Sequence, residues 1–401
     1  MLPSYAGDSI ANLAASIARA CGADGSSLAA SLSPRHQRLL DQLEQAPAVY
    51  LVLLDGVGCR QLHTLCPDGV LAAHQRDELT SVFPSSTAPA ITSLMTASTP
   101  AAHGVSGWLM HEPGLSVAQA ATDVIRALPM DVRGQPSLPV PATIWQWRSW
   151  MEELPAQCAC WQPVEVYDSD YSRQAMAGAH RQGYAHLDEV IEQIRQSAPA
   201  AGAAAEDKRQ FTYIYLPQFD ATAHRFGWQS DEAAACLAQF DAWFARLLDA
   251  LAGTGALVLA VADHGFVDIP ASGRLQLAQF PQIQACLAAP LAGEPRLVYC
   301  RVEPAAQQRF EMLVQAQLGH ACELYRSLTL IEAGWFGAAA GQRLGPRCGT
   351  HTLVMRSGFT LTDQIPGERA HHFIGMHGGV DVDEMRVPLI VASPPVARAT
   401  L

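Results

Sequence analysis

The sequence predicts an α/β layered fold in which a mostly parallel central sheet is flanked by helices. Four short apolar runs, each bounded by turn residues, are typical of buried strands and cover residues 49–54, 211–216, 256–262 and 387–392. Apolar residues at helical spacing occur at 186–198, 231–252 and 305–319. Because strands and helices alternate in this way, we interpret all four runs as parallel strands.

Residues 268–370 have a different pattern and are expected to form an inserted cap subdomain. They hold strand-like runs at 296–302 and 322–331, a helix at 305–318 and a glycine-rich stretch around 338–349. Residues 1–267 and 371–401 then make up the main α/β core, which a chain of 401 residues is long enough to form. Residues 110–170 are predicted to be loop-rich, and the alanine-rich stretch 199–205 is predicted to be a loop.

The composition excludes several classes of protein. Hydrophobic residues make up 49% and charged residues 16% of the chain, which is typical of a globular enzyme and not of a disordered chain. The formal net charge is −12 and Lys208 is the only lysine, so we expect neither a nucleic-acid polymer nor a membrane surface as partner. No segment reaches the roughly 18 apolar residues that a membrane-spanning helix needs.

The cysteines and the N-terminus both favour a cytoplasmic protein. Ten cysteines are scattered without a paired framework, which is typical of reduced and mostly buried thiols. The N-terminal residues lack a basic segment followed by a compact apolar run, so no signal peptide is expected. Instead, Ile10, Leu13 and Ile17 share one stripe of a predicted helix that Asp8 or Ser9 caps.

Acidic residues and histidines follow three of the predicted strands. Asp55 comes after the first run, Asp220 and His224 after the second, and Asp263 and His264 after the third. Open α/β sheets build their sites at such carboxyl ends. The D-x-x-x-H spacing places Asp220 and His224 one turn apart on one face of a helix. Each of these features taken alone is also explained by an ordinary turn.

Two further candidates lie in a glycine-rich loop and at a helix end. His377 lies in the run GMHGG, whose glycines allow the backbone to approach a ligand closely. Thr87 precedes a predicted helix that begins at about residue 88, so Thr87 is predicted to be its N-cap. The N-terminus of a helix favours negative charge, such as that of an alkoxide or a phosphate, although an ordinary capping threonine has the same position.

Together these residues supply the ligands of a binuclear metal site. Two cations about 3.5–4 Å apart need about six or seven ligands. The candidates are three aspartates, three histidines and one threonine, namely Asp55, Thr87, Asp220, His224, Asp263, His264 and His377. Two divalent cations are therefore expected, with zinc as the first choice and manganese as the alternative.

The order of these motifs resembles that of the alkaline phosphatase superfamily and, within it, the type I phosphodiesterase and nucleotide pyrophosphatase group. The series runs from Asp55 through FPSSTAP, TPAAHG, D-x-x-x-H and Asp-His-Gly to a final His-Gly. The resemblance implies an alkaline-phosphatase-like layered fold with a variable cap. It also implies two zinc sites and a threonine nucleophile: Asp220, His224 and His377 hold one zinc, and Asp55, Asp263 and His264 hold the other together with Thr87.

One residue departs from the pattern of this group. Its diesterases usually carry an asparagine shortly after the His-Gly pair, where the amide donates to a phosphoryl oxygen. In the run HGVSGW, Trp108 stands near that place. Because an indole donates one N–H or stacks on a base, Trp108 is a candidate substrate contact.

The resemblance implies metal-dependent hydrolysis of phosphate diesters or nucleotide pyrophosphates through a phospho-threonine intermediate. The substrate is then a small phosphoryl compound, such as a nucleotide. A phosphomonoesterase would use the same binuclear site. A phosphonate hydrolase would also use this site but would be expected to have lysines in its pocket, and Lys208 is the only lysine in the chain. A nucleotide-binding protein without turnover is the alternative outside the enzymes, although binding alone does not require seven ligands.

Other histidines and aromatic residues have structural interpretations. Trp145, Trp147 and Trp150 are predicted to be core residues, and His103 is predicted to pack at a helix–loop junction. His371 and His372 precede the His377 loop and are expected to support the site or to lie on the surface.

Overall fold

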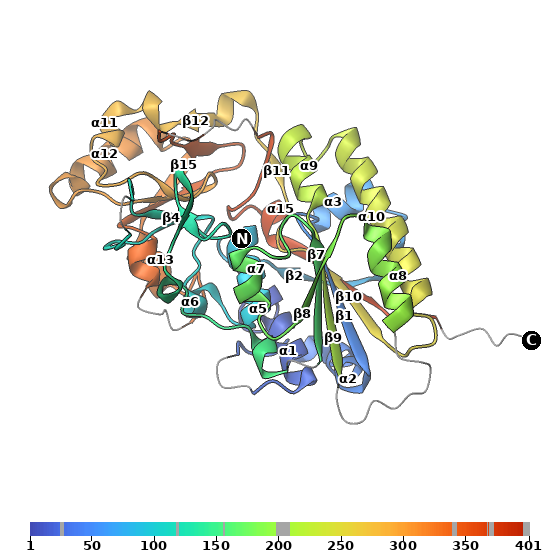
Figure 1. Ribbon diagram of the computed structural model, residues 1–401. Helices are drawn as coiled ribbons and strands as arrows, with labels where there is room; N and C mark the ends of the chain where they lie inside the picture. The colour runs from blue at the N-terminus through green and yellow to red at the C-terminus, as the bar shows by residue number, and fades with distance from the viewer. Residues whose placement is uncertain are drawn as a thin grey trace, which may run out of the picture.

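Two sheets organise the chain (Figure 1). The computed structural model describes residues 1–24, 28–117, 120–154, 157–197, 209–338, 343–366, 368 and 373–395. The main sheet has seven strands in the order β2-β19-β10-β1-β9-β7-β8. They are β1 (Ala48–Leu54), β2 (Gln75–Thr80), β7 (Cys158–Pro163), β8 (His180–Tyr184), β9 (Gln210–Leu216), β10 (Leu257–Val261) and β19 (Arg386–Ala392).

The centre of the main sheet is parallel, as predicted. β1 lies between β10 and β9 and runs parallel to both, with Leu53 opposite Val261 and Leu54 opposite Leu216. The predicted strand at 387–392 forms, but its predicted parallel direction is wrong, because β19 is antiparallel to both β10 and β2. The chain enters β19 at the carboxyl edge of the parallel strands, where Gly265 N–H donates to Glu384, so β19 must run away from that edge.

Helices cover both faces of the main sheet. On one side in Figure 1 lie α3 (Cys59–Leu65), α8 (Leu187–Ser197), α9 (Gln218–Phe226) and α10 (Asp231–Ala250), with α4 (Val70–His74) against α10. On the other side lie α1 (Ile10–Cys21), α5 (Thr87–Thr96) and α7 (Asp170–Ala175), and α2 (Gln37–Gln45) contacts α1. The N-cap of α1 is Ser9, and the predicted apolar stripe of α1 is buried. The predicted α/β layered arrangement is therefore confirmed.

The second sheet is antiparallel and has the order β15-β16-β14-β13-β3-β4-β5-β6. Its strands are β3 (Leu109–His111), β4 (Val124–Arg126), β5 (Asp131–Val132), β6 (Gln135–Pro139), β13 (Ala292–Glu294), β14 (Leu297–Cys300), β15 (Cys322–Arg326) and β16 (His351–Met355). The stretch 110–170, predicted to be loop-rich, therefore holds most of the short strands β3 to β6, which join those of 292–355 through the pairing of β3 with β13. The division into a core and a cap at 268–370 stays a prediction.

The predicted strand at 322–331 is too long. β15 ends at Arg326, and α13 (Ser327–Glu332) follows. Ser327 turns the chain, because its backbone N–H donates to Thr350 and its hydroxyl donates to the carbonyl of Cys348 at 2.8 Å. The predicted helix is α12 (Gln307–Leu318), which buries Phe310, Val314 and Leu318.

Short elements complete the fold. Two two-stranded sheets pair β11 (Val267–Asp268) with β18 (Gly375–Met376) and β12 (Arg274–Gln276) with β17 (Thr360–Thr362). The remaining α-helices are α6 (Pro100–His103), α11 (Pro281–Gln284), α14 (Leu344–Arg347) and α15 (Val382–Met385). None of the helices in the described residues combines the length and the apolar character that a membrane crossing requires.

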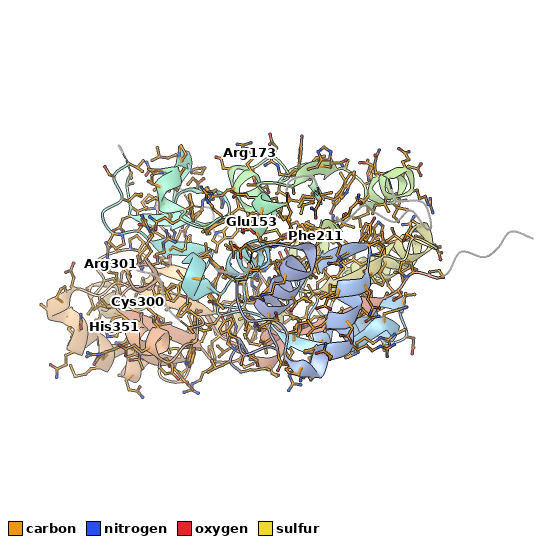
Figure 2. All side chains as sticks on the ribbon, turned by 90° about the horizontal axis from the view of Figure 1, so that it is seen from below. Glu153, Arg173, Phe211, Cys300, Arg301 and His351 are labelled. Atoms are coloured by element: carbon orange, nitrogen blue, oxygen red, sulfur yellow. The ribbon has the colours of Figure 1, made fainter. Side chains whose placement is uncertain are left out.

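Several predicted structural residues lie in the interior. The tryptophans Trp145, Trp147 and Trp150 are buried, as predicted. His103 ends α6 and lies 2.9 Å from the hydroxyl of Ser93 in α5. Figure 2 shows His351 beside Cys300, its partner across β14 and β16, at the end of the molecule far from Phe211. All ten cysteines carry free thiols. His371, His372, Lys208 and the stretch 199–205 lie outside the described residues.

Candidate metal centre

The carboxyl ends of three neighbouring parallel strands bring the acidic candidates together. Asp55 directly follows β1, Asp263 follows β10, and Asp220 lies in the first turn of α9 just after β9. Because β1 is flanked by β10 and β9 in level register, all three residues emerge at one edge of the sheet. Asp55 is 1% exposed and Asp263 is fully buried.

His264 lies at the centre of one group of candidates. Its Nε2 atom is 3.4 Å from Asp55 Oδ1, 3.4 Å from Asp263 Oδ2 and 3.2 Å from Thr87 Oγ1. The structure thus brings together the four residues predicted to form one metal site.

The second predicted group is equally compact. Asp220 Oδ1 is 3.4 Å from His224 Nε2 and 3.6 Å from His377 Nε2, and the two imidazole nitrogens are 3.2 Å apart. The D-x-x-x-H spacing lies on α9, as predicted. Asp220 Oδ1 is also 3.9 Å from His264 Nε2, so the two groups adjoin each other.

A backbone carbonyl holds each of the three histidine rings at its Nδ1 atom. Nδ1 of His224 lies 2.8 Å from the carbonyl of Gly375, that of His264 3.0 Å from Gly265, and that of His377 3.2 Å from Ser85. A carbonyl only accepts, so each Nδ1 carries a proton and each ring turns its Nε2 atom into the cluster. Histidines that bind metals are commonly oriented by such an outer hydrogen bond.

The carboxylates also lack the partners that a buried charge requires. Asp55 Oδ1, Asp220 Oδ1 and Asp263 Oδ2 are buried without a hydrogen-bond partner. Within the described ranges, no arginine forms an ion pair with any of the three. Burial, followed by the charges of Asp263 and Asp220, raises the pKa of Asp55 well above its usual range. Burial also raises the pKa of Asp220. Bound cations would supply the missing positive charge.

The other carboxylate oxygens are held in place by the surrounding chain. The hydroxyl of Tyr215 in β9 donates to Asp55 Oδ2. Asp263 Oδ1 accepts from the backbone amides of Gly56 and His264 at 3.0 and 3.1 Å. Asp55 and Asp263 therefore each present one fixed oxygen to the cluster, as a preorganised ligand set requires.

Thr87 is the first residue of α5, not its N-cap as predicted. The N-cap position belongs to Ser86, but the Ser86 side chain caps no backbone amide of the helix. Its hydroxyl donates to Glu294 Oε1 at 2.6 Å instead, because β13 of the second sheet delivers a buried carboxylate to this point. Thr87 therefore lies at the N-terminus of an almost wholly buried helix, and its hydroxyl is directed at His264.

The donor set fits two divalent cations. Two adjoining groups of oxygen and imidazole ligands, with unpartnered oxygens directed inward, match the ligands that zinc takes in catalytic sites. A sequence model of the type I phosphodiesterase/nucleotide pyrophosphatase family matches residues 52–380, a range that contains every member of the cluster. The chain belongs to this family. It is therefore a phosphoric ester hydrolase of a metal-dependent family that acts on nucleotides.

Solved structures of ectonucleotide pyrophosphatase/phosphodiesterase 5 share the fold. The murine protein has a TM-score of 0.64 at 14% identity, over 86% of this chain and 88% of that chain. An inactive murine variant in complex with AMP has a TM-score of 0.61 at 14% identity, with the same coverage. The human protein has a TM-score of 0.61 at 13% identity over the same shares. The predicted alkaline-phosphatase-like fold is thus confirmed. No curated protein sequence matches the chain.

Trp108, the candidate substrate contact, is linked to Ser86 through Glu294. The amide of Trp108 donates to Glu294 Oε1 at 2.6 Å, the same oxygen that binds Ser86. Trp108 as a whole residue is 37% exposed. Its role as a substrate contact stays a prediction.

Glu294 is the residue of this site that the sequence did not indicate. It is 7% exposed and ends the short strand β13. Burial raises its pKa to about 7, against the opposing effects of its hydrogen bonds from Ser86 and Trp108. A lone glutamate in the run AGEPR carries no motif, and only the tertiary structure, in which β13 pairs with β3, brings it to Trp108 and Ser86.

Proposed function

We propose that this family member hydrolyses phosphate diesters or nucleotide pyrophosphates at a binuclear zinc site, with Thr87 as the nucleophile. The observation that carries the proposal is the position of the Thr87 hydroxyl. It lies 3.2 Å from His264 Nε2, at the start of a buried helix and inside a cluster of three aspartates and three histidines. An isolated capping threonine would not have these neighbours.

The two groups described above would hold the cations. Asp220, His224 and His377 would hold one, and Asp55, Asp263 and His264 the other together with Thr87. When bound, two divalent cations supply positive charge that lowers the pKa of a hydroxyl and offsets charge on the phosphoryl and leaving oxygens. Manganese is the alternative, because its oxygen and imidazole ligands are the same.

The residues of the chain then have defined tasks. Thr87 Oγ1 forms a bond to phosphorus, the bond from phosphorus to the leaving oxygen breaks, and the hydroxyl proton is lost to solvent while the leaving oxygen gains a proton from water. A water molecule next attacks the phospho-threonine, which releases a phosphate monoester and restores the Thr87 hydroxyl. The amides at the start of α5 face the phosphoryl oxygens and stabilise their charge.

A nucleotide is the favoured substrate class. The structurally similar murine ectonucleotide pyrophosphatase/phosphodiesterase 5 variant was solved with AMP. AMP is the monoester that remains after hydrolysis of a diester or pyrophosphate of adenosine, so its binding is consistent with such a reaction.

Replacement of Thr87 tests the proposal. Thr87→Ala should lower the turnover of bis-p-nitrophenyl phosphate by about 10³-fold or more, because the attacking oxygen is lost. Metal content, measured by elemental analysis, should stay near two zinc ions per chain, since the aspartates and histidines are retained. Thr96→Ala, in the last turn of the same helix, is the control for effects on α5. A Thr87→Ala variant with full activity would exclude Thr87 as the nucleophile.

A further inference from the structure

Glu294 joins the two segments of the chain that meet at the nucleophile. Its Oε1 accepts the hydroxyl of Ser86, the residue before Thr87, and the amide of Trp108, both at 2.6 Å. On its other side lies Gly378, the residue after His377, where an added Cβ atom would fall 2.7 Å from Cβ of Glu294. The Glu294 side chain therefore lies against the loop that carries His377, while its carboxyl group binds the segment that carries Thr87.

No cationic side chain in the described part of the chain pairs with this carboxyl group. The nearest arginine in sequence, Arg296, directs Nη2 to Glu384 Oε2 at 2.7 Å and hydrogen-bonds the carbonyls of Arg356 and Phe359. The two hydrogen bonds that Glu294 accepts both favour its ionised form. Its electrostatic interactions extend to His264 and Asp220 in the cluster. Burial raises the pKa of Glu294 to about 7, so above this pH the carboxyl group is ionised and adds a negative charge beside the segment that carries Thr87.

Such a charge has a direct consequence for the substrate. A phosphate diester, or the internal phosphorus of a pyrophosphate, carries one negative charge, whereas a phosphate monoester carries close to two above pH 7. A buried carboxylate is poorly screened by solvent, so it opposes the second charge of a monoester more than the single charge of a diester.

We propose that Glu294 is a specificity-determining residue that makes the site select singly charged phosphoryl groups over doubly charged phosphate monoesters. This inference rests on the proposed function. It assigns the preference for diesters to a residue of the second sheet. The hydrogen bonds of Glu294 go to Ser86 and Trp108, and none goes to Thr87 or to a predicted metal ligand. Glu294 acts by its charge on the substrate, and its two hydrogen bonds keep that charge at a fixed position.

The test compares two substrates in the zinc-loaded enzyme at pH 8. Glu294→Gln keeps the shape and an accepting oxygen but removes the charge. The ratio of kcat/KM for p-nitrophenyl phosphate to that for bis-p-nitrophenyl phosphate should rise at least tenfold, mainly through a lower KM for the monoester. The inhibition constant of inorganic phosphate, which is largely doubly charged at this pH, should fall by a similar factor.

Two further variants separate charge from structure. Glu294→Asp keeps the charge and should hold the substrate ratio within about threefold of wild type even if both rates fall. Glu112→Gln alters a buried carboxylate that pairs with Arg343 and Arg347 and should leave the ratio unchanged. If Glu294→Gln does not fold, Glu294→Ala provides the second removal of charge and must raise the ratio in the same way.

The outcomes distinguish the two proposals. If wild-type enzyme does not hydrolyse the diester, or if Thr87→Ala keeps full activity, the proposed function fails. If wild type hydrolyses the diester through Thr87 but the charge-removing variants keep the wild-type ratio, or lose both activities equally, only the role of Glu294 is overturned.

Discussion

The inward orientation of the ligands depends on single hydrogen bonds at their outer atoms. Each histidine of the cluster has a backbone carbonyl at Nδ1, and Asp55 has the hydroxyl of Tyr215 at Oδ2. These partners leave Nε2 and Oδ1 facing the cluster. The ligands are thus oriented before any cation binds, which reduces the entropy lost on binding.

Replacement of Tyr215 tests whether such a single hydrogen bond matters for metal binding, and Tyr213 on the same strand is the matched control. Tyr215→Phe removes the donor to Asp55 and should weaken zinc binding by about 10–100-fold, the usual effect of losing an outer-shell partner. Tyr213→Phe, two residues earlier in β9, removes a buried hydroxyl that has no hydrogen-bond partner, so zinc affinity should not change. Competition with a chromophoric chelator measures both affinities. Equal affinities in the two variants would contradict the role given to Tyr215.

At the scale of elements, the turn at Asp263–Gly265 packs closely against α15, and this contact positions His264. Gly265 N–H donates to Glu384, and an added Cβ atom at Gly265 would fall 2.0 Å from the carbonyl oxygen of Asp383. Ser81, directly after β2, donates its hydroxyl to the carbonyl of Asp263 and links the segment that leads to Thr87 to the same turn. The turn has no space for a side chain at Gly265.

Gly265→Ala should therefore displace the turn or α15. We expect a loss of about 1–3 kcal/mol in the free energy of unfolding, the usual effect of overpacking, together with weaker zinc binding. Gly345→Ala is the control, because no atom lies within 4 Å of its added Cβ and alanine favours the helix α14. Urea unfolding of the zinc-free proteins measures the difference. A Gly265→Ala protein as stable as wild type would show that the turn relaxes freely.

On the scale of the whole molecule, the two sheets meet at the site. The main sheet supplies Asp55 and Asp263 at the ends of its strands, and the second sheet supplies Glu294 from β13. Several buried carboxyl groups thus converge, and no arginine in the described residues forms an ion pair with them. Their mutual repulsion opposes folding in the absence of metal.

Removal of metal should consequently lower the thermal stability. A ligand present at 100 times its Kd stabilises the folded state by about 2.7 kcal/mol, so chelation should lower Tm by several degrees. The pKa of Asp55 and that of Asp220 are raised in the folded chain. The folded state therefore binds protons more readily than the unfolded one, and the chelated protein should lose stability as pH rises from the usual aspartate pKa through the raised values. Scanning calorimetry with and without chelator measures this, and an unchanged Tm would argue against resident metal.

The sequence predicted the elements whose signals are local, and with them the positions of the candidate ligands at the strand ends. The four apolar strands, the amphipathic α1 and the D-x-x-x-H pair on α9 appear where their periodicity places them, because local periodicity determines which face is buried. It mispredicted the direction of β19 and the length of β15 and gave no signal for the short strands β3 to β6, since pairing between distant segments decides these features. Thr87 was expected one position too early relative to its helix.

By itself, then, the sequence determined the family-type order of motifs and the identity of the residues at the strand ends. Strand order is a tertiary property, and only the placement of β1 between β10 and β9 makes those ends converge. The same holds for Glu294, which β13 brings to Ser86 across 208 residues of chain. A residue without a motif acquires its role through what it contacts, and contacts between distant segments form only when the two sheets pack together.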